Sequence, residues 1–474
     1  MTILTSQLSI MLLLLLSLTT FHKSTCSNHT LVSCNENDRE TLLTFKQGLN
    51  DNRGRISTWS TEKDCCAWKG VHCDSITGRV TKLDLNNCFL EGKINLSILE
   101  LEFLSYLDLS INKFDVIRIP SIQHNITHAS NLVHLDLSYT VVTALDNLGW
   151  LSPLSSLKNL NLNGIDLHKE TNWLQAVATL SSLLKLHLSK CKLNNFINPS
   201  LEYLNLSSLV TLDLSWNNFA SPLPDGFFNL TKDITYIDLS VSHIYGEMPS
   251  SLLYLQNLRH LDLSYNQLQG SIPNGIRHLA HIEYLDLNKN HLHGSIPYGI
   301  GQLAHIQFLD LSKNMLSGFI PSTLGNLSSL YSLSIGSNNF SSEISNKTFS
   351  KLYSLNFLDL SSLNIVFQFD LDWVPPFQLN GLYLAHINQG PNFPSWIYTQ
   401  KSLEEFGISS SGISLVDRNN FFSLIEEINN LYLSNNSIAE DISNLTLMGY
   451  EIWLDHNNFT GGLPNISTWT DQPG

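Results

Sequence analysis

Residues 258–273 read LRHLDLSYNQLQGSIP, and two similar segments follow: IEYLDLNKNHLHGSIP at residues 282–297 and IQFLDLSKNMLSGFIP at residues 306–321. Their central leucines recur every 24 residues. In each segment two leucines alternate with an aspartate, which is the period of a short strand with one apolar face. A single strand of this kind cannot bury its leucines alone. The segments must therefore stack and share one continuous core.

These segments match the leucine-rich repeat pattern L-x-x-L-x-L-x-x-N-x-L. Each has an asparagine at the conserved ladder position of that pattern: Asn266, Asn290 and Asn314. A short side chain with two donors and one acceptor suits an inner bend, where backbone groups would otherwise be buried without partners. The LxGxIP segment that follows each asparagine resembles the plant-specific class of leucine-rich repeats.

The composition of the chain argues against a nucleic-acid partner, and its N-terminal sequence indicates secretion. The 474 residues are 14% charged and carry a formal net charge of −15. Binding to phosphates needs basic patches, so we expect no nucleic-acid partner. The apolar run at residues 10–18 is typical of a secretory signal peptide, which we predict at residues 1–26. This run is too short to span a bilayer, and no later stretch reaches about 18 apolar residues.

Four of the seven cysteines cluster ahead of the first repeat: Cys34, Cys65, Cys66 and Cys73. In a secreted chain this cluster predicts two disulfides with three possible pairings. A bond between the adjacent Cys65 and Cys66 would be strained, which favours Cys34 with one of them and Cys73 with the other. A zinc site is the alternative, although the spacing lacks a paired CxxC. Cys88 and Cys191 occupy the asparagine position of their repeats, and we interpret them as small buried residues.

The segment before the first repeat is predicted to be a cap at residues 27–79. Leu42, Leu43, Phe45 and Leu49 have helical spacing. A cap of this kind is needed because the core of a terminal repeat would otherwise face water, and two tryptophans, Trp59 and Trp68, can cover it. The pattern LLTFK…W…DCCAWKGVHC…TGRV resembles the N-terminal cap of plant leucine-rich-repeat receptors.

We expect residues 80–474 to form about sixteen repeats of a right-handed α/β solenoid. This horseshoe would have a parallel sheet on its concave side and short 3₁₀ or irregular turns outside. The 28 residues from Leu107 to Leu135 predict an insertion around residues 118–127. The first central residues of the strands are Leu83, Leu107, Leu135, Leu160, Leu186, Leu212, Ile237, Leu261, Leu285, Leu309, Leu333, Leu358, Leu382, Phe406, Leu431 and Ile452.

A second motif, within residues 373–403, indicates a narrower family. Residues 373–379 read WVPPFQL and residues 390–403 read GPNFPSWIYTQKSL. This block resembles plant receptor-like proteins that include fungal-xylanase receptors and disease-resistance proteins. The resemblance implies extracellular recognition of a peptide, protein or glycan elicitor in immune or developmental signalling. It also implies a partner receptor kinase, since no HRD or DFG kinase motif appears, and a plasma-membrane anchor in a segment beyond residue 474. The alternative is a soluble secreted inhibitor of microbial wall-degrading enzymes, similar to polygalacturonase inhibitors.

Aromatic side chains beside the strand leucines are the candidate ligand-binding residues. Exposed aromatics on a rigid sheet can anchor a partner. The alternative is that each ring packs on its neighbour, but the group from Trp216 to Phe308 favours binding. The candidates are Tyr106, His134, Tyr139, Trp216, Tyr236, His260, Tyr265, Tyr284, Phe308 and Phe357.

An aspartate row follows the same strands, from Asp84 to Asp359. Neighbouring strands lie roughly 4.8 Å apart, close to the roughly 5 Å carboxylate separation of retaining glycosidases. However, the same pair recurs in repeat after repeat, whereas acid–base catalysis needs two carboxylates in different environments. No loop supplies the shell of oxygen ligands that calcium requires. We therefore expect no catalytic residue, no metal and no cofactor.

Secretion also predicts N-glycans at several Asn-x-Ser/Thr sequons. The candidates are Asn95, Asn125, Asn205, Asn229, Asn326, Asn339, Asn346, Asn435, Asn444, Asn458 and Asn465.

Overall fold

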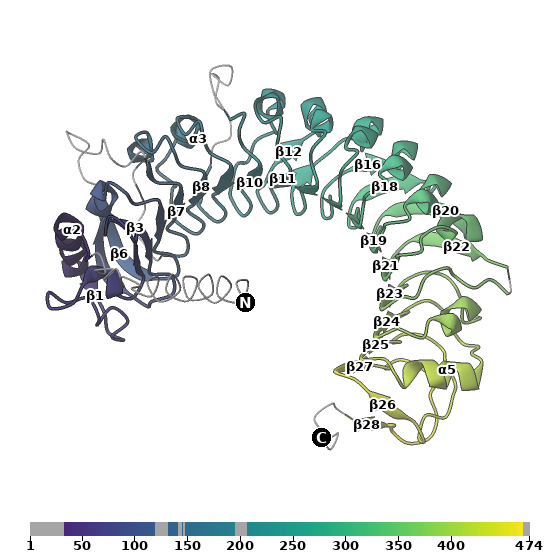
Figure 1. Cartoon of the computed structure of the whole chain (residues 1–474). Helices are drawn as coiled ribbons and strands as arrows, with labels where there is room; N and C mark the ends of the chain where they lie inside the picture. Colours follow the sequence, from purple (N-terminus) through teal and green to yellow (C-terminus); the bar gives the residue numbers. More distant parts are fainter. Residues whose placement is uncertain are drawn as a thin grey trace, which may run out of the picture.

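The computed structural model describes residues 33–118, 131–140, 145, 147–194, 206–370 and 372–467. Strands line the inside of an arc and short helices lie along its outside (Figure 1). The predicted solenoid with a concave parallel sheet is therefore confirmed. The predicted signal peptide, the insertion after Arg118 and the sequons Asn125 and Asn205 lie outside the described residues.

One sheet of seventeen strands runs the length of the arc. Its first strand, β2 (Val71–Cys73), pairs antiparallel with β3. The next sixteen strands are parallel, and each carries one of the predicted central residues; Leu285, for example, lies opposite Leu261 and Leu309. They are β3 (Val80–Asp84), β5 (Tyr106–Asp108), β7 (His134–Asp136), β8 (Asn159–Asn161), β9 (Lys185–His187), β10 (Thr211–Asp213), β11 (Tyr236–Asp238), β13 (His260–Asp262), β15 (Tyr284–Asp286), β17 (Phe308–Asp310), β19 (Ser332–Ser334), β21 (Phe357–Asp359), β23 (Gly381–Tyr383), β24 (Glu405–Gly407), β25 (Asn430–Tyr432) and β27 (Glu451–Trp453).

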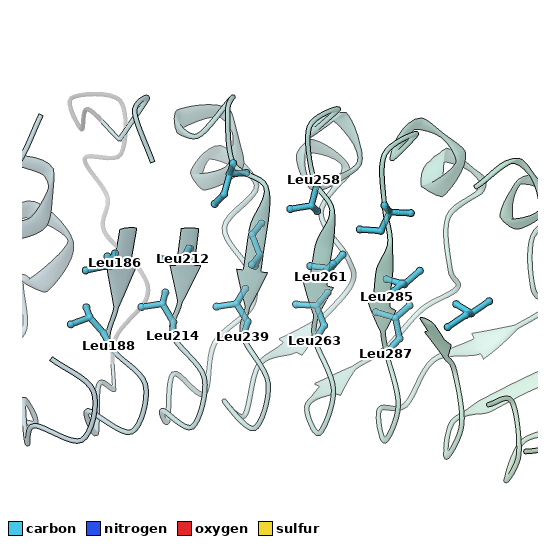
Figure 2. Packing of buried hydrophobic residues seen from close by; sticks show 14 of the residues in the cluster. Leu186, Leu188, Leu212, Leu214, Leu239, Leu258, Leu261, Leu263, Leu285 and Leu287 are labelled. Carbon is cyan, nitrogen blue, oxygen red and sulfur yellow. The ribbon is translucent and has the colours of Figure 1, made fainter. Parts of the chain in front are cut away.

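The core is a continuous column of leucines behind this sheet (Figure 2). Leu261 and Leu263 of one repeat stand beside Leu285 and Leu287 of the next, and all four are fully buried. Burial of one such side chain contributes roughly 1.5–3 kcal/mol. Since each leucine is covered by the adjacent repeats, the stacking of repeats stabilises every strand.

The asparagine at the inner bend ties adjacent repeats together. The Nδ2 group of Asn290 donates to the carbonyl of Leu263 in the preceding repeat at 2.9 Å and to that of Leu287 at 3.1 Å. Its Oδ1 accepts from the backbone N–H of Leu268 at 2.9 Å. Asn266 and Asn314 make equivalent contacts. The predicted role in satisfying buried backbone groups is confirmed.

The two cysteines at this ladder position are buried, as the sequence predicts. The thiol of Cys191 donates to the carbonyl of Leu162 at 3.1 Å and so replaces one asparagine contact. Burial raises the pKa of Cys191 to about 12 and also raises that of Cys88. Because the thiolate is the reactive form, neither thiol is activated.

Short helices on the outer side return the chain to the next strand. The proline of GxIP precedes several of them, at Pro273, Pro297 and Pro321. The fixed φ of proline suits the start of a helical turn. The 3₁₀ helices of the repeats are η2 (Leu96–Glu100), η4 (Gly149–Leu151), η6 (Asp225–Leu230), η7 (Ser250–Tyr254), η8 (Asn274–His278), η9 (Tyr298–Gln302), η10 (Ser322–Asn326) and η11 (Ser395–Thr399), and a further one, η1 (Cys65–Ala67), lies in the N-terminal segment. The α-helices of the repeats are α3 (Trp173–Ala178), α4 (Asn346–Phe349) and α5 (Arg418–Ile425).

Additional short strands lie between the concave sheet and these helices, where the sequence predicted only turns. Most of them form because stacking places equivalent segments of successive repeats side by side, so that their backbone groups can pair. The exception is β1 (Leu49–Asn50) of the N-terminal segment, which pairs antiparallel with the strand Glu91–Asn95. At Gly270 and Gly294 the backbone has φ of 82° and 77°, which favours glycine. The strands are β1 (Leu49–Asn50), β4 (Glu91–Asn95), β6 (Lys113–Arg118), β12 (Tyr245–Gly246), β14 (Gln267–Leu268), β16 (His293–Gly294), β18 (Met315–Gly318), β20 (Asn339–Ser345), β22 (Asn364–Gln368), β26 (Thr446–Met448) and β28 (Asn465–Ser467).

The N-terminal segment covers the first repeat through helix α2 (Glu36–Gln47). Leu42 and Phe45 on this helix are buried. Leu49 lies beyond the helix, on β1, so its predicted place on the helical face is wrong; the helix ends first, at Gly48. Trp59 and Trp68 stack with ring centroids 5.3 Å apart and are buried in the core.

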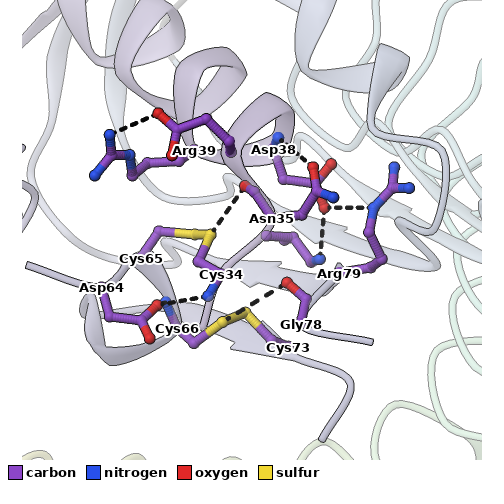
Figure 3. Close-up of a disulfide and its surroundings, with 12 residues drawn as sticks. Cys34, Asn35, Asp38, Arg39, Asp64, Cys65, Cys66, Cys73, Gly78 and Arg79 are labelled. Atoms are coloured by element: carbon purple, nitrogen blue, oxygen red, sulfur yellow. Dashed lines mark hydrogen bonds and ion pairs between the residues drawn. A yellow bond between two sulfur atoms is a disulfide. The ribbon is translucent and has the colours of Figure 1, made fainter. Parts of the chain in front are cut away.

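Two disulfides hold this segment (Figure 3), joining Cys34 to Cys65 and Cys66 to Cys73. This is one of the pairings that the sequence favours, and it leaves no thiolates in the cluster for zinc. Beside the bonds, the buried carboxylate of Asp38 accepts from the Arg79 guanidinium at 3.1 Å and from the backbone of Val80 at 2.8 Å. The carboxylate thereby connects helix α2 to the first strand of the repeats.

Candidate ligand-binding surface

The structure divides the ten candidate aromatic and histidine residues between two places. Seven precede the central leucine or isoleucine of a strand and so lie on the concave sheet: Tyr106, His134, Tyr236, His260, Tyr284, Phe308 and Phe357. The other three lie in the tight turn that follows a strand: Tyr139, Trp216 and Tyr265. The sequence placed all ten on one surface, because both positions flank the same leucines.

Four of the sheet residues form a continuous ring stack across β11, β13, β15 and β17. The centroids of Tyr236, His260, Tyr284 and Phe308 lie 4.2, 4.2 and 4.3 Å apart, and neighbouring planes differ by 8°, 13° and 6°. The inner rings therefore cover one another, as the packing alternative predicts. Burial lowers the pKa of His260, which favours the neutral ring. A ligand can therefore reach only the edges of these rings and the outer faces of Tyr236 and Phe308 at the two ends of the stack.

The turn aromatics are far more accessible to a ligand. Tyr139, Trp216 and Tyr265 are 50%, 55% and 46% exposed, at left-handed φ values of 53°, 58° and 54°. The Nζ of Lys190 lies 4.9 Å from the Trp216 ring centroid, and that of Lys289 lies 4.4 Å from the Tyr265 ring. These contacts place cations beside open ring faces along one edge of the sheet.

The aspartate row on the strands is less uniform than the repeat predicts. Burial, together with the charge of Asp262, raises the pKa of Asp238 to about 6 and that of Asp286 to about 7. At Asp213 burial acts in the same direction, but hydrogen bonds from His187 and Ser215 outweigh it and the pKa is lowered. The row therefore mixes firmly ionised carboxylates with ones that take up a proton near neutral pH.

Strand β19 interrupts both rows. Its residues Ser332 and Ser334 replace the ring and the carboxylate, while the strands on either side read Phe-Leu-Asp. A hollow of about 580 Å³ opens there. Its lining includes Phe308, Asp310, Ser332, Ser334, Phe357 and Asp359, with Tyr265 and Lys313 also contributing. The repeat motifs alone did not predict this site, although an alignment of the repeats shows the two serines where other strands carry a ring and an aspartate.

A second cluster joins residues from β5 and β7. The ligand-type atoms of Asp108, His134 and Asp136 lie within 4.8 Å of one another. The carboxylate of Asp108 accepts from Ser110 at 2.6 Å, and that of Asp136 accepts from Asn161 at 2.8 Å. These hydrogen bonds explain the cluster as part of the polar network on the sheet.

Sequence comparisons agree with this architecture. The family model described as leucine-rich repeat region matches residues 233–411, and that described as leucine rich repeat N-terminal domain matches residues 26–74. The tomato (Solanum lycopersicum) receptor-like protein EIX2 is 37% identical over 568 residues, which covers 91% of this chain and 56% of the relative. Tomato receptor-like protein EIX1 is 36% identical over 270 residues, covering 48% of this chain and 26% of the relative. The chain belongs to the plant leucine-rich-repeat receptor-like proteins.

This receptor-like chain spans about half or less of the length of those two relatives. Its family consists of ligand-binding proteins without enzymatic activity, and the relatives and the N-terminal domain indicate an extracellular or cell-surface protein. Among the described residues, no helix is both long and apolar enough to cross a membrane.

Solved structures show the same fold. The leucine-rich-repeat ectodomain of the Arabidopsis receptor kinase HAESA, in complex with an N-terminally extended IDA peptide hormone, superimposes with a TM-score of 0.70. It is 25% identical, and the match covers 91% of this receptor-like chain and 76% of that chain. HAESA in complex with IDA and the co-receptor SERK1 gives a TM-score of 0.72 at 24% identity, covering 91% and 79% of the two chains.

The motif that identified the receptor-like family from sequence has a structural role. The rings of Trp373 and Phe369 lie 4.3 Å apart, and Trp396 packs on Phe369 at 5.9 Å. Phe377 of the same motif lies 6.2 Å from Phe349. These residues therefore form an aromatic cluster outside the concave sheet, and the motif explains packing rather than ligand choice.

The sequons of the receptor-like chain leave the concave sheet free. Within the described part of the chain none of the candidate asparagines lies on the seventeen-stranded sheet. Most are exposed, but Asn346 is half-buried and its side-chain amide donates to Asp370. Occupied glycans at the exposed positions would therefore leave the ring stack, the turn aromatics and the hollow accessible.

Proposed function

We propose that this chain is the extracellular ligand-recognition region of a plant receptor-like protein in immune signalling. In this proposal it follows the secretory pathway to the plasma membrane, and its ligand is a peptide, protein or glycan elicitor. The observation that carries the proposal is the concentration of accessible aromatic rings and acidic side chains along the sequon-free concave side between β10 and β21. Aromatic anchors on such a surface are where binding energy concentrates.

The most exposed rings define where a ligand would be held. Trp216 and Tyr265 lie two repeats apart on the turn edge, and Asp238 and Asp286 lie on the strands beside them. A ligand that contacts both the turn aromatics and the strand aspartates would combine apolar contact with charge recognition. The peptide bound to HAESA supports a peptide as the ligand of a similar fold. In this proposal a partner receptor kinase would carry the signal into the cell.

A peptide display experiment tests the proposal. The secreted chain is used to select binders from a library of random peptides, and their affinity is measured for three proteins. These are the wild type, a concave variant with Trp216→Ala and Tyr265→Ala, and a matched outer-face variant with Tyr254→Ala and Tyr298→Ala. Tyr254 and Tyr298 are 68% and 74% exposed on η7 and η9.

We expect the concave variant to lose at least about tenfold in affinity and the outer-face variant to bind like the wild type, since central aromatic anchors typically contribute 2 kcal/mol or more. Secretion yield and thermal unfolding of all three proteins check that they fold. Selected peptides that bind the concave variant unchanged, or that need Tyr254 and Tyr298, contradict the proposal.

A further inference from the structure

We propose that the hollow above β19 binds an arginine side chain of the ligand. This inference rests on the proposed function, because it assigns a ligand class to the same concave surface. The hollow has an apolar end, made by two rings, and an acidic end, made by two carboxylates, with a serine floor beneath each. The aliphatic stem of an arginine suits the apolar end, and its planar cationic guanidinium suits the acidic end.

The apolar end lies between Phe308 and Phe357. The register places Phe308 opposite Ser332 and Ser332 opposite Phe357, so the two rings stand two strand spacings apart. That is roughly 9–10 Å between backbones, and the intervening position carries no ring. The face of Phe308 that another ring would cover is therefore open, in contrast to the faces inside the stack.

Gly381 keeps this gap wide. The Phe357 ring leans over Gly381 on β23, where an added Cβ would lie 2.6 Å from Cδ2 of the ring. Phe357 also contacts Tyr383, with centroids 5.6 Å apart. Since the ring leans toward β23, it leaves space above Ser332, and the side chain of a ligand can enter between the two phenylalanines.

The acidic end lies between Asp310 and Asp359, with Ser334 between them. The backbone N–H of Ser312 donates to Asp310 at 2.8 Å, and that of Ser361 donates to Asp359 at 2.8 Å, which orients both carboxylates. Burial raises the pKa of Asp310, and the charge of Asp359 raises it further. A cation between the two groups would relieve this repulsion.

The charge and length of the hollow favour arginine over other side chains. Two carboxylates and Lys313, which lines the rim, leave one net negative charge. The rings and the carboxylates are two residues apart along each strand, roughly 6.6 Å, which is within the reach of one arginine. A guanidinium can donate to both carboxylates at once and stack on a ring, whereas an ammonium is a compact point charge. A phenylalanine would fill the apolar end but leave the carboxylates unpaired.

The test uses N-acetyl-L-arginine amide as the probe, followed by ligand-observed NMR, with N-acetyl-L-lysine amide and N-acetyl-L-phenylalanine amide as comparisons. The proteins are the wild type, Ser332→Phe, which restores a ring at the gap, and Asp310→Asn/Asp359→Asn. Thr211→Phe is the matched control, because Thr211 holds the same strand position on β10, away from the hollow. Thermal unfolding of each protein verifies the fold.

We expect the arginine probe to bind the wild type with a millimolar dissociation constant, at least about tenfold more tightly than either comparison probe. Ser332→Phe and the double Asn variant should each weaken it at least about tenfold, while Thr211→Phe retains it. Equal binding of the arginine and lysine probes, unchanged binding to Ser332→Phe, or no binding to the wild type overturns the inference. If display-selected peptides still require Trp216 and Tyr265 in that case, the proposed function stands and only the arginine site fails.

Discussion

Tyr284 stacks on Phe308 with ring centroids 4.3 Å apart and planes 6° apart, and this contact is the last step of the ring stack before β19. The other face of Tyr284 is covered by His260 at 4.2 Å. Tyr284 thus belongs to the framework of the concave sheet, whereas Phe308 has one face toward the hollow. Residues at equivalent strand positions therefore have different roles, depending on what their neighbours cover.

Removing the Tyr284 ring should destabilise the protein but leave the exposed aromatic side chains of the binding surface in place. Tyr284→Leu loses two stacked contacts, each worth roughly 0.5–1.5 kcal/mol, so we expect the free energy of unfolding in urea to fall by about 1–3 kcal/mol. Tyr298→Leu on the exposed outer face is the control and should change it by less than about 0.5 kcal/mol. Equal effects of the two changes would show that the stack contributes nothing to stability.

Within the aspartate row, an Asp→Asn substitution should have opposite effects on stability at Asp286 and at Asp213. The pKa of Asp286 is raised from 3.8 to about 7, so its contribution to stability is greatest below about pH 4 and is lost as the pH rises through 7. Asp286→Asn should therefore stabilise the protein at pH 8 by up to about 4 kcal/mol and have little effect at pH 4. The asparagine keeps an acceptor for the Asn288 backbone, which lies 2.9 Å away.

Asp213 provides the matched control within the same row. Its pKa is lowered, with the imidazole of His187 at 3.6 Å, so its contribution is present at neutral pH and is lost on acidification below its ordinary value of 3.8. Asp213→Asn should destabilise the protein at pH 7. Urea unfolding at pH 4, 7 and 8 measures both variants. Changes of the same sign at pH 8 would contradict the assignment.

Truncating an asparagine of the ladder should lower the free energy of unfolding. Asn290→Ala leaves the buried N–H of Leu268 without its side-chain partner, while the carbonyl of Leu263 loses one of its two amide donors and keeps Asn266 at 3.1 Å. One unsatisfied buried group costs roughly 1–3 kcal/mol, so we expect a loss of about 1–3 kcal/mol in unfolding free energy. Asn257→Ala, at an exposed asparagine on the outer side, should be close to neutral. A similar result for both would rule out the ladder as a main support of the core.

The two disulfides should differ in how much they stabilise the cap. Cys34–Cys65 closes a segment with a sequence separation of 31, and Cys66–Cys73 one of 7. Loop-closure entropy then favours the longer loop by about 1 kcal/mol. Cys34→Ser/Cys65→Ser should therefore lower thermal stability more than Cys66→Ser/Cys73→Ser, as measured by circular dichroism. A larger loss from the second pair would contradict the entropic account.

The repeats could be predicted from the amino-acid sequence, because their signals are local. Leucines on either side of Asp286 predict a short strand with one apolar face, and the recurrence of this pattern every 24 residues predicts stacked strands in register. The role of Asn290 followed for the same reason, since one residue type with one hydrogen-bonding capacity returns at one bend. Leu49 was misplaced because helical spacing alone does not show where a helix ends.

The role of each surface residue, by contrast, depends on its neighbours in the folded chain. Tyr265 and Tyr284 flank equivalent leucines, yet one lies open on a turn and the other is covered inside a stack. Asp213 and Asp286 occupy the same repeat position with opposite pKa shifts. The hollow at Ser332 exists only because strands 24 or 25 residues apart come side by side. Burial, stacking and charge repulsion depend on neighbours across the sheet, and one-dimensional spacing does not reveal which side chains those neighbours carry.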